Sequence, residues 1–280
     1  MKIKQLLPVF AAITLAIGLH SCKKADTSGT DELETTFELS GDQAIADNLT
    51  EDANDVFMEI AVDNNVAGNF APQTVETTNI IACATVTVTP LVGFPKTIVI
   101  DFGTSCTHNG IVRSGKINIV LSDSVRRPGS TAVMTFTNYY VNSYKVEGTI
   151  TWTNTSTPGT RSWSRRTENG KITAPDGRYW LHSGIKYVNQ TAGVATPFNL
   201  LDDVFAITGS HSVTNAAGRT RDCTVLEALQ KKVICSNIDK GKLKVQGPNH
   251  YAVIDFGDGS CDNLATISID GRAPRTIILR

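Results

Sequence analysis

Short runs of β-branched and aromatic residues, separated by glycine, proline, asparagine and aspartate, fill the chain from about Thr78 to its end. Runs of this kind with turn residues between them predict β-strands. No stretch between them reads as a crossover helix, so neighbouring strands should pair antiparallel. The pattern predicts a mainly β fold of antiparallel sheets, as a sandwich, a partial barrel or a long meander. The clearest runs are 85–89, 96–102, 116–121, 131–141, 144–154, 178–188, 203–215, 222–229, 241–245, 251–256, 265–270 and 275–279.

One segment before the strands has helical periodicity. Its apolar positions recur three or four residues apart, and Ser40 with Gln43 forms a capping-box pattern. We expect one short N-terminal helical segment within 41–68. Its polar face is acidic and lacks lysine, so packing on a sheet is favoured over binding to a membrane surface. The periodic positions are Ile45, Leu49, Ala53, Val56, Phe57 and Ile60.

The first residues have the pattern of an export signal. Lys2 and Lys4 precede an apolar run that is too short for a confident membrane span, and small residues follow it. We therefore predict a signal peptide over 1–21. The sequence Leu-His-Ser-Cys that ends at Cys22 resembles a bacterial lipobox, and the resemblance implies that Cys22 carries the lipid and becomes the first mature residue.

The residues after Cys22 are polar and without periodicity, which predicts a flexible tether over 22–40. A lipobox followed by such a segment is similar to the start of surface lipoproteins of the Bacteroidota. This resemblance implies a protein anchored by lipid to the outer membrane, at the surface or the periplasmic face.

Two segments of eleven residues form a repeated phrase and are nearly identical: VIDFGTSCTHN from Val99 and VIDFGDGSCDN from Val253. Each copy follows a cysteine, a strand, a turn rich in glycine and proline, and a second strand. Folding such a hairpin brings the two cysteines together at its open end, within the distance that a disulfide needs. An exported protein keeps disulfides, so we predict Cys83–Cys106 and Cys235–Cys261, with Cys223 free. The alternative is Cys223–Cys235.

The repeated phrase also predicts a turn. The phenylalanine should point into the core, the glycine should allow the chain to turn, and the aspartate should cap the turn. Two such hairpins suggest an internal duplication, with β halves at 70–155 and 156–280; the alternative is one continuous domain. A weaker hypothesis places a metal ion, calcium, at Asp255, Asp258 and Asp262.

Longer stretches of the chain carry a wider resemblance: RPGSTAVMTFTNYYVNSYKVEGT, DDVFAITGSHSVTN and DFGDGSCDNLATISIDG. With the duplicated Cys-hairpin-Asp-Phe-Gly-Cys pattern they are similar to a group of exported Bacteroidota lipoproteins of unknown function. The resemblance covers about residues 40–280 and implies no established activity. Asp-Ser-Val at 123–125 resembles the O-glycosylation sequon of the same bacteria, which marks Ser124.

Composition narrows the classes of function. The chain has 280 residues, of which 19% are charged, and a formal net charge of -1. A nucleic-acid partner is therefore disfavoured. No zinc spacing, phosphate loop or nucleophile elbow occurs, so we expect no cofactor and lean against an enzyme.

Aromatic residues lie among arginines between 152 and 187, a pattern that suits stacking on sugars or on anionic partners. A sheet with aromatics inward and cations outward would give the same pattern. The residues of this candidate binding face are Trp152, Trp163, Arg165, Arg178, Tyr179 and Trp180.

Three hypotheses for the function follow. The first is an envelope protein with a non-catalytic binding or structural role, whose ligand is a glycan or a protein and whose lipid contacts the membrane. The second is a hydrolase that acts on glycan or peptide. The third is a periplasmic carrier that holds a lipid. A deep apolar cavity would favour the carrier, and a cleft with converging carboxylates would favour the enzyme.

Overall fold

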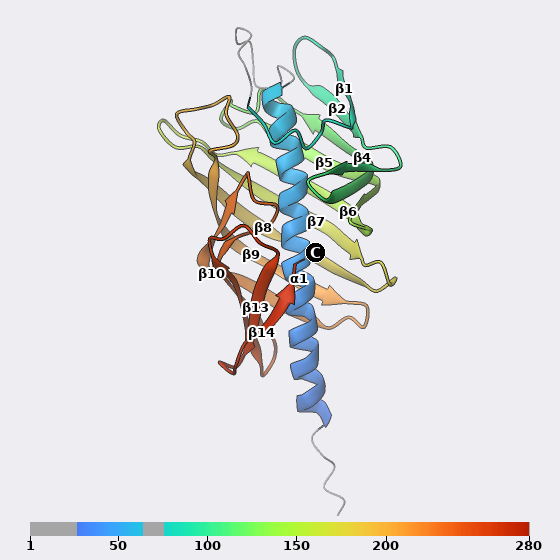
Figure 1. Ribbon diagram of the computed structural model, residues 1–280, viewed down its shortest axis with the longest axis vertical. Helices are drawn as coiled ribbons and strands as arrows, with labels where there is room; N and C mark the ends of the chain where they lie inside the picture. Colours follow the sequence, from blue (N-terminus) through green and yellow to red (C-terminus); the bar gives the residue numbers. More distant parts are fainter. Residues whose placement is uncertain (1–26, 64–75, 280) are drawn as a thin grey trace, which may run out of the picture.

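The computed structural model of the chain describes residues 27–63 and 76–279, so the expected signal peptide and Cys22 lie outside the described residues. Within them, one helix, α1 (Thr27–Asp63), lies along a single sheet of antiparallel strands (Figure 1). The strands are β1 (Thr85–Thr89), β2 (Lys96–Asp101), β3 (Cys106–His108), β4 (Ile111–Leu121), β5 (Thr131–Val141), β6 (Tyr144–Asn154), β7 (Ser162–Thr173), β8 (Tyr179–Ala192), β9 (Val204–Asn215), β10 (Thr220–Lys232), β11 (Lys240–Gln246), β12 (Tyr251–Asp258), β13 (Leu264–Ile269) and β14 (Arg275–Ile278).

The sheet is a long meander, which confirms the mainly β fold and selects one of its three predicted forms. Strands follow each other in chain order from β1 to β14, except that β2 and β3 both pair with β4. The two predicted halves meet at the hydrogen-bonded pair β6–β7, so they form one continuous sheet. The meander has no second copy of a six-strand first half, and the internal duplication is not seen at the level of domains.

Bulges bend the strands in the middle of the sheet. The pairing register shifts beside Gly115 in β4 and beside Gly148 in β6. At Gly148, where φ is +117°, an added Cβ would lie 2.7 Å from the Cα of Gly170 in β7. Only glycine allows this approach of neighbouring strands. Bulges of this kind bend and twist a sheet, and here they let it curve around α1.

α1 is buried on most sides, because partners from many strands reach it. Its side chains are buried almost without interruption from Thr35 to Ala61. Apolar residues of the helix pack on the inner face of the sheet, as where Phe57 meets Trp152 with ring centroids 5.7 Å apart. The helix and the inner face therefore form one core.

Acidic side chains on successive turns of α1 also face the sheet, where cations meet them. Arg113 of β4 binds Asp52 through two hydrogen bonds of 2.6 and 3.0 Å. The other buried pairs of α1 with β7, β8 and β10 are Arg165–Glu51 at 2.7 Å, Lys186–Asp47 at 2.7 Å and Lys231–Asp55 at 2.7 Å. Charges at this depth are stable only when paired, so these contacts fix the position of the helix along the sheet.

The helix differs from its prediction in length. It begins at Thr27, so residues 27–40 of the predicted tether are helical, and the segment is not short. Ser40 is no N-cap, because its hydroxyl donates to the carbonyl oxygen of Thr36 inside the helix at 2.6 Å. Contacts with the sheet hold the added turns, as where Arg219 binds Asp31 at 2.7 Å.

The repeated phrase has the local structure that the sequence predicts. Both disulfides are confirmed, with Cα atoms 5.6 Å apart in Cys83–Cys106 and 5.1 Å apart in Cys235–Cys261. Cys223 is a buried free thiol.

The two copies of Asp-Phe-Gly also share local contacts. The carboxylates of Asp101 and Asp255 accept the N–H of Gly103 and Gly257 at 2.9 and 3.0 Å. The phenylalanines between them, Phe102 and Phe256, are buried. The repetition therefore encodes an aspartate-capped bend with a buried phenylalanine; it follows the end of β2 in the first copy but lies within β12, which ends at Asp258, in the second.

Candidate functional site

A pocket of about 490 Å³ opens where α1 ends, at the edge of the sheet formed by the ends of β6 and β8 and the start of β7. Met58, Ala61 and Val62 of the last helical turns form one wall. The β4–β5, β6–β7 and β8–β9 loops close the sides. In an antiparallel meander every second connection lies at the same end of the sheet, so these three loops lie together. The volume lies within the range of about 300–1,000 Å³ that small-molecule sites occupy. From the loops and strands come Val125, Arg126, Pro128, Trp152, Asn154, Ser156, Thr157, Pro158, Gly159, Thr160, Arg161, Trp163, Gln190, Val194, Pro197, Leu200 and Asp203.

Two buried tryptophans are part of the lining. The rings of Trp152 and Trp163 lie 5.9 Å apart and are tilted by 36°. Phe205 packs edge-on against Trp163 at 5.1 Å and holds it from behind. Both side chains are buried, and both indole N–H groups lack a hydrogen-bond partner among the described residues. Buried indole N–H groups normally find a partner, so this wall can both enclose an apolar group and donate to a ligand atom.

Charged groups lie at the rim. Arg126 donates to the carbonyl oxygen of Pro197 at 2.7 Å and stacks on Phe198, with its guanidinium carbon 4.7 Å from the ring centroid. Arg161 donates to the side-chain oxygen of Gln190 at a long 3.4 Å. Burial lowers the pKa of Arg126, and the charge of Arg161 lowers it further, so the two guanidinium groups lie close enough to repel each other.

Asp203 is the one acidic residue among the described residues that line the pocket. Its carboxylate accepts a hydrogen bond of 2.6 Å from Gln190. Burial raises the pKa of Asp203 to about 7 and the neighbouring Asp202 adds to the rise, while Arg161 and the bond from Gln190 oppose it. Asp202 instead accepts the hydroxyl of Thr196 at 2.7 Å. The pocket therefore contains a single carboxyl group, whereas glycoside hydrolysis typically uses two that face the same bond.

The predicted binding face is not a surface. Trp152, Trp163 and Trp180 are buried in the core, and Arg165 is buried against Glu51. The cations therefore do not all point outward, because α1 supplies acids on the inner side of the sheet. Arg178 and Tyr179 keep exposed parts, and Arg178 binds Asp42 of the helix at 2.7 Å. The structure brings two of the six predicted residues, Trp152 and Trp163, to the pocket described above.

The three aspartates of the metal hypothesis line an open hollow beside β12. Each uses a carboxylate oxygen to cap a turn: Asp255 accepts from Gly257, Asp258 from Ser260, and Asp262 from Leu264. Their ligand atoms do not form a group that lies within 4.8 Å of one another, so the geometry among the described residues does not favour an ion there.

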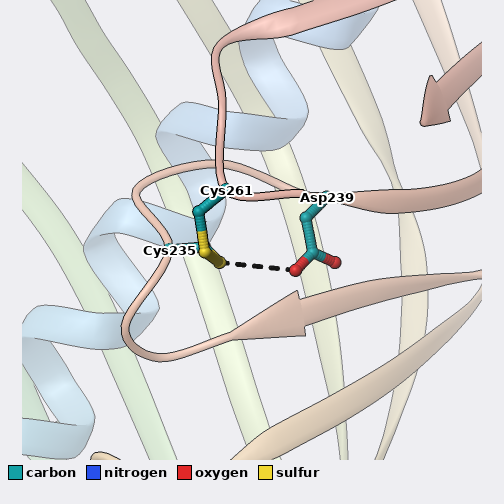
Figure 2. Close-up of side chains that lie close together, drawn as sticks. All are labelled: Cys235, Asp239 and Cys261. Carbon is teal, nitrogen blue, oxygen red and sulfur yellow. Dashed lines mark hydrogen bonds between the residues drawn. A yellow bond between two sulfur atoms is a disulfide. The ribbon is translucent and has the colours of Figure 1, made fainter. Parts of the chain in front are cut away.

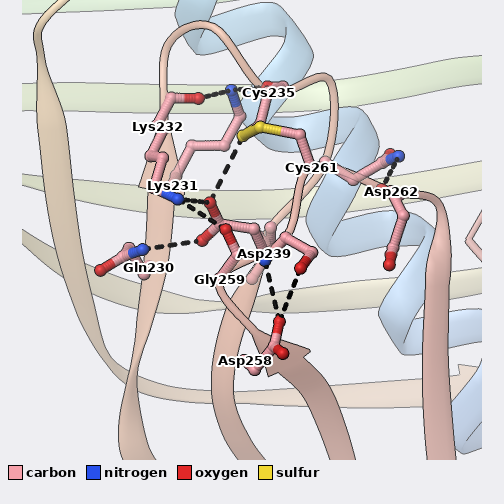
Figure 3. Close-up of a disulfide and its surroundings, with 12 residues drawn as sticks. Gln230, Lys231, Lys232, Cys235, Asp239, Asp258, Gly259, Cys261 and Asp262 are labelled. Atoms are coloured by element: carbon pink, nitrogen blue, oxygen red, sulfur yellow. Dashed lines mark hydrogen bonds and ion pairs between the residues drawn. A yellow bond between two sulfur atoms is a disulfide. The ribbon is translucent and has the colours of Figure 1, made fainter.

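One compact group of metal-ligand residue types does occur in the described part of the chain: Cys235, Asp239 and Cys261 (Figure 2). Their sulfur atoms are joined in a disulfide, so no thiolate remains to bind a metal. Asp239 is engaged by Lys232 at 3.2 Å and by Gln230 at 3.1 Å (Figure 3). This cluster is a structural staple between the β10–β11 loop and the end of β12.

A second charged cluster lies between α1 and strands β8 and β9. Lys186 bridges Asp47 and Glu51 at 2.7 and 3.3 Å, and His211 lies 3.8 Å from Asp47. Lys186 and His211 lower the pKa of Asp47, although burial opposes them. The adjoining cavity of about 20 Å³ is too small for an organic ligand. No motif or spacing in the sequence indicates this cluster, because its members come from α1, β8 and β9.

The other predicted positions have plain structural settings. Ser124 lies half-buried in the loop between β4 and β5, and its glycosylation stays a prediction. Burial raises the pKa of the Cys223 thiol, which makes it a poor nucleophile. Among the described residues, no helix combines the length and the apolar character that a membrane span needs.

Comparison of the chain with protein-family models, with curated proteins and with solved structures finds no match. The function is therefore inferred from the pocket and from the N-terminal residues up to Cys22.

Proposed function

We propose that this chain is an exported, lipid-anchored protein of the cell envelope that binds a small, mostly apolar molecule without transforming it. The observation that carries the proposal is the pocket at the end of α1, with its walls of tryptophan, valine, leucine and methionine. Lys2, Lys4, the apolar run and Cys22 support export and anchoring. Lipid attachment at Cys22 would place the protein at the outer membrane.

The pocket favours binding over the hydrolase. Apolar walls with a few placed polar groups are typical of ligand sites. Asp203 alone provides a carboxyl group in the described lining, and its one close partner is the amide of Gln190. Hydrolysis of a glycan or peptide requires an activated nucleophile or a second acid beside it. Of the three hypotheses, the carrier fits this arrangement best.

Binding of a neutral apolar dye, N-phenyl-1-naphthylamine, tests the proposal. The emission of the dye rises in apolar surroundings, and we expect saturable binding to the folded protein. Met58→Trp adds bulk to the pocket wall and should weaken binding by roughly tenfold or more, since overpacking of a filled site is unfavourable.

Ile45→Trp is the matched control. Ile45 is half-buried on the same helix but does not line the pocket, so this variant should bind the dye like the wild type. Circular dichroism establishes that both variants are folded. No saturable binding to the wild type, or equal binding by both variants, would overturn the proposal.

A further inference from the structure

The two arginines of the pocket are half-buried at its rim, whereas Asp203, Gln190 and Asn154 are buried polar residues of its lining. Arg126 and Arg161 come from two different loops, and Asp203 is the one acid of the described lining. Asp203 is buried and held by Gln190, and with a pKa of about 7 it is only partly charged at neutral pH. Among the charged side chains of the described lining, two guanidinium groups therefore accompany one partly charged carboxyl group.

Arg161 has hydrogen-bonding capacity to spare. A guanidinium group has five N–H donors in a planar fork. The one hydrogen bond of Arg161 within the described residues is the long contact with Gln190, and no carboxylate of those residues lies within 4.0 Å of it. The amide nitrogen of Gln190 is already engaged by Asp203 and by the carbonyl oxygen of Ala192 at 3.0 Å. Gln190 thereby holds Arg161 at the rim with its other donors available to a ligand.

Arg126 adds a second positive charge whose position is fixed. Its bond to Pro197 and its stacking on Phe198 attach the guanidinium to the loop between β8 and β9. Two guanidinium groups that repel each other in a half-buried setting are stabilised by an anion between them. Carboxylate and phosphate groups fit such a fork well.

Behind the rim, the lining becomes apolar. Trp152, Trp163 and Leu200 are buried, and Val125 and Met58 complete the wall. A ligand that occupies both regions has an apolar body and an acidic end. We propose that the pocket binds a single-chain amphiphile with an acidic head group, which Arg161 and Arg126 contact while the chain lies against the two tryptophans. This inference rests on the proposed function and narrows the ligand class.

A pair of ligands of equal chain length tests the inference. Dodecanoate and dodecan-1-ol should both displace N-phenyl-1-naphthylamine from the wild type at pH 7, with dodecanoate binding about tenfold or more tightly, since a hydrogen bond between two charged groups is stronger than one to a neutral hydroxyl. Arg161→Gln should remove this preference, so that the two amphiphiles bind with equal affinity within about twofold.

Arg166→Gln is the matched control. Arg166 lies five residues further along, on the exposed side of β7, and does not line the pocket. This variant should keep the full preference for dodecanoate. Arg126→Gln is the second test variant, and it should reduce the preference in the same direction if Arg161→Gln fails to fold.

The outcomes separate the two proposals. If the wild type does not bind the dye, the proposed function itself fails. If the wild type binds the dye and both amphiphiles displace the dye equally well, the pocket does not distinguish an acid from an alcohol. In that case only the present inference is overturned. Retention of the preference in folded Arg161→Gln and Arg126→Gln would overturn it as well.

Discussion

His182 is enclosed between the sheet and α1 and has almost no contact with solvent. Burial lowers the pKa of His182 to about 4, and the nearby charges of His211 and Lys186 lower it further, while Asp47 opposes them. The imidazole is therefore neutral at pH 7 in the folded protein. Its ordinary pKa in an unfolded chain is about 6.5.

This difference predicts a dependence of stability on pH. Between pH 6.5 and 4, His182 binds a proton in the unfolded chain but not in the folded protein. The free energy of unfolding therefore decreases as the pH falls through this window. At pH 5 the loss is roughly 2 kcal/mol. His182→Gln should reduce by this amount the drop in the free energy of unfolding between pH 7 and pH 5. Urea titrations at the two pH values measure it, and an unchanged drop in the variant would show that His182 is not its source.

Single residues were predicted best where the chain itself contains all the partners. Asp101, Gly103 and the cysteines of each hairpin lie close in sequence, so their roles as cap, turn and disulfide could be inferred. Arg165 could not be placed, because its partner Glu51 is more than a hundred residues away. Alternation in a strand shows which residues share a face, but it does not show that a helix brings acids to that face.

At the scale of elements, α1 is the part that the sequence described least well. Its first turns are rich in charged and small polar residues, a composition typical of a tether. They are helical because the sheet and its loops supply partners: Glu32, for instance, accepts two hydrogen bonds of 2.7 Å each from Asn249, in the loop between β11 and β12. β7 was missed for a related reason, since its buried positions include Arg165 and its middle has a bulge near Gly170.

The ion pairs of α1 predict large effects of single substitutions. Arg113 donates two hydrogen bonds to the carboxylate of Asp52. Asp52→Asn removes the charge of that carboxylate and leaves a buried guanidinium without its counterion. We expect a loss of about 3–5 kcal/mol in the free energy of unfolding. Asp31→Asn is the control on the same helix, because Asp31 is exposed in its pair with Arg219, and its effect on the free energy of unfolding should be much smaller than that of Asp52→Asn. Urea denaturation measures both, and a small effect of Asp52→Asn would mean that the helix is not held by its charges.

At the scale of the molecule, the two ends of α1 have different surroundings. The first turns of the helix extend beyond the sheet at one end of the long axis, and the last turn reaches the pocket near the other end (Figure 1). At a rise of about 1.5 Å per residue, Thr27 and Ala61 are separated by roughly 50 Å. Cys22 precedes Thr27 by only a few residues, so a lipid there would attach the molecule by the end far from its pocket.

Attachment through Cys22 predicts where the protein is found in the cell. Mass spectrometry of the mature protein should show an acylated N-terminal Cys22, and Cys22→Ser should move the protein from the membrane fraction to the soluble fraction. Cys223→Ser is the control: that thiol is buried, and its loss should leave the protein with the membrane. A Cys22→Ser variant that remains in the membrane fraction would exclude the lipid anchor.

The order of partners along the chain has a consequence for biogenesis. α1 is synthesised first, but the lysine that meets Asp55 belongs to β10, and the backbone N–H that Asn48 receives belongs to Ile238 after it. Arg113, Arg165 and Lys186 are synthesised earlier and can neutralise other acids of the helix, but until Lys231 has been synthesised Asp55 has no cation to pair with, and burying it alone is strongly unfavourable. The last turns of the helix therefore reach their final packing only after β10 and the loop that follows it have been made.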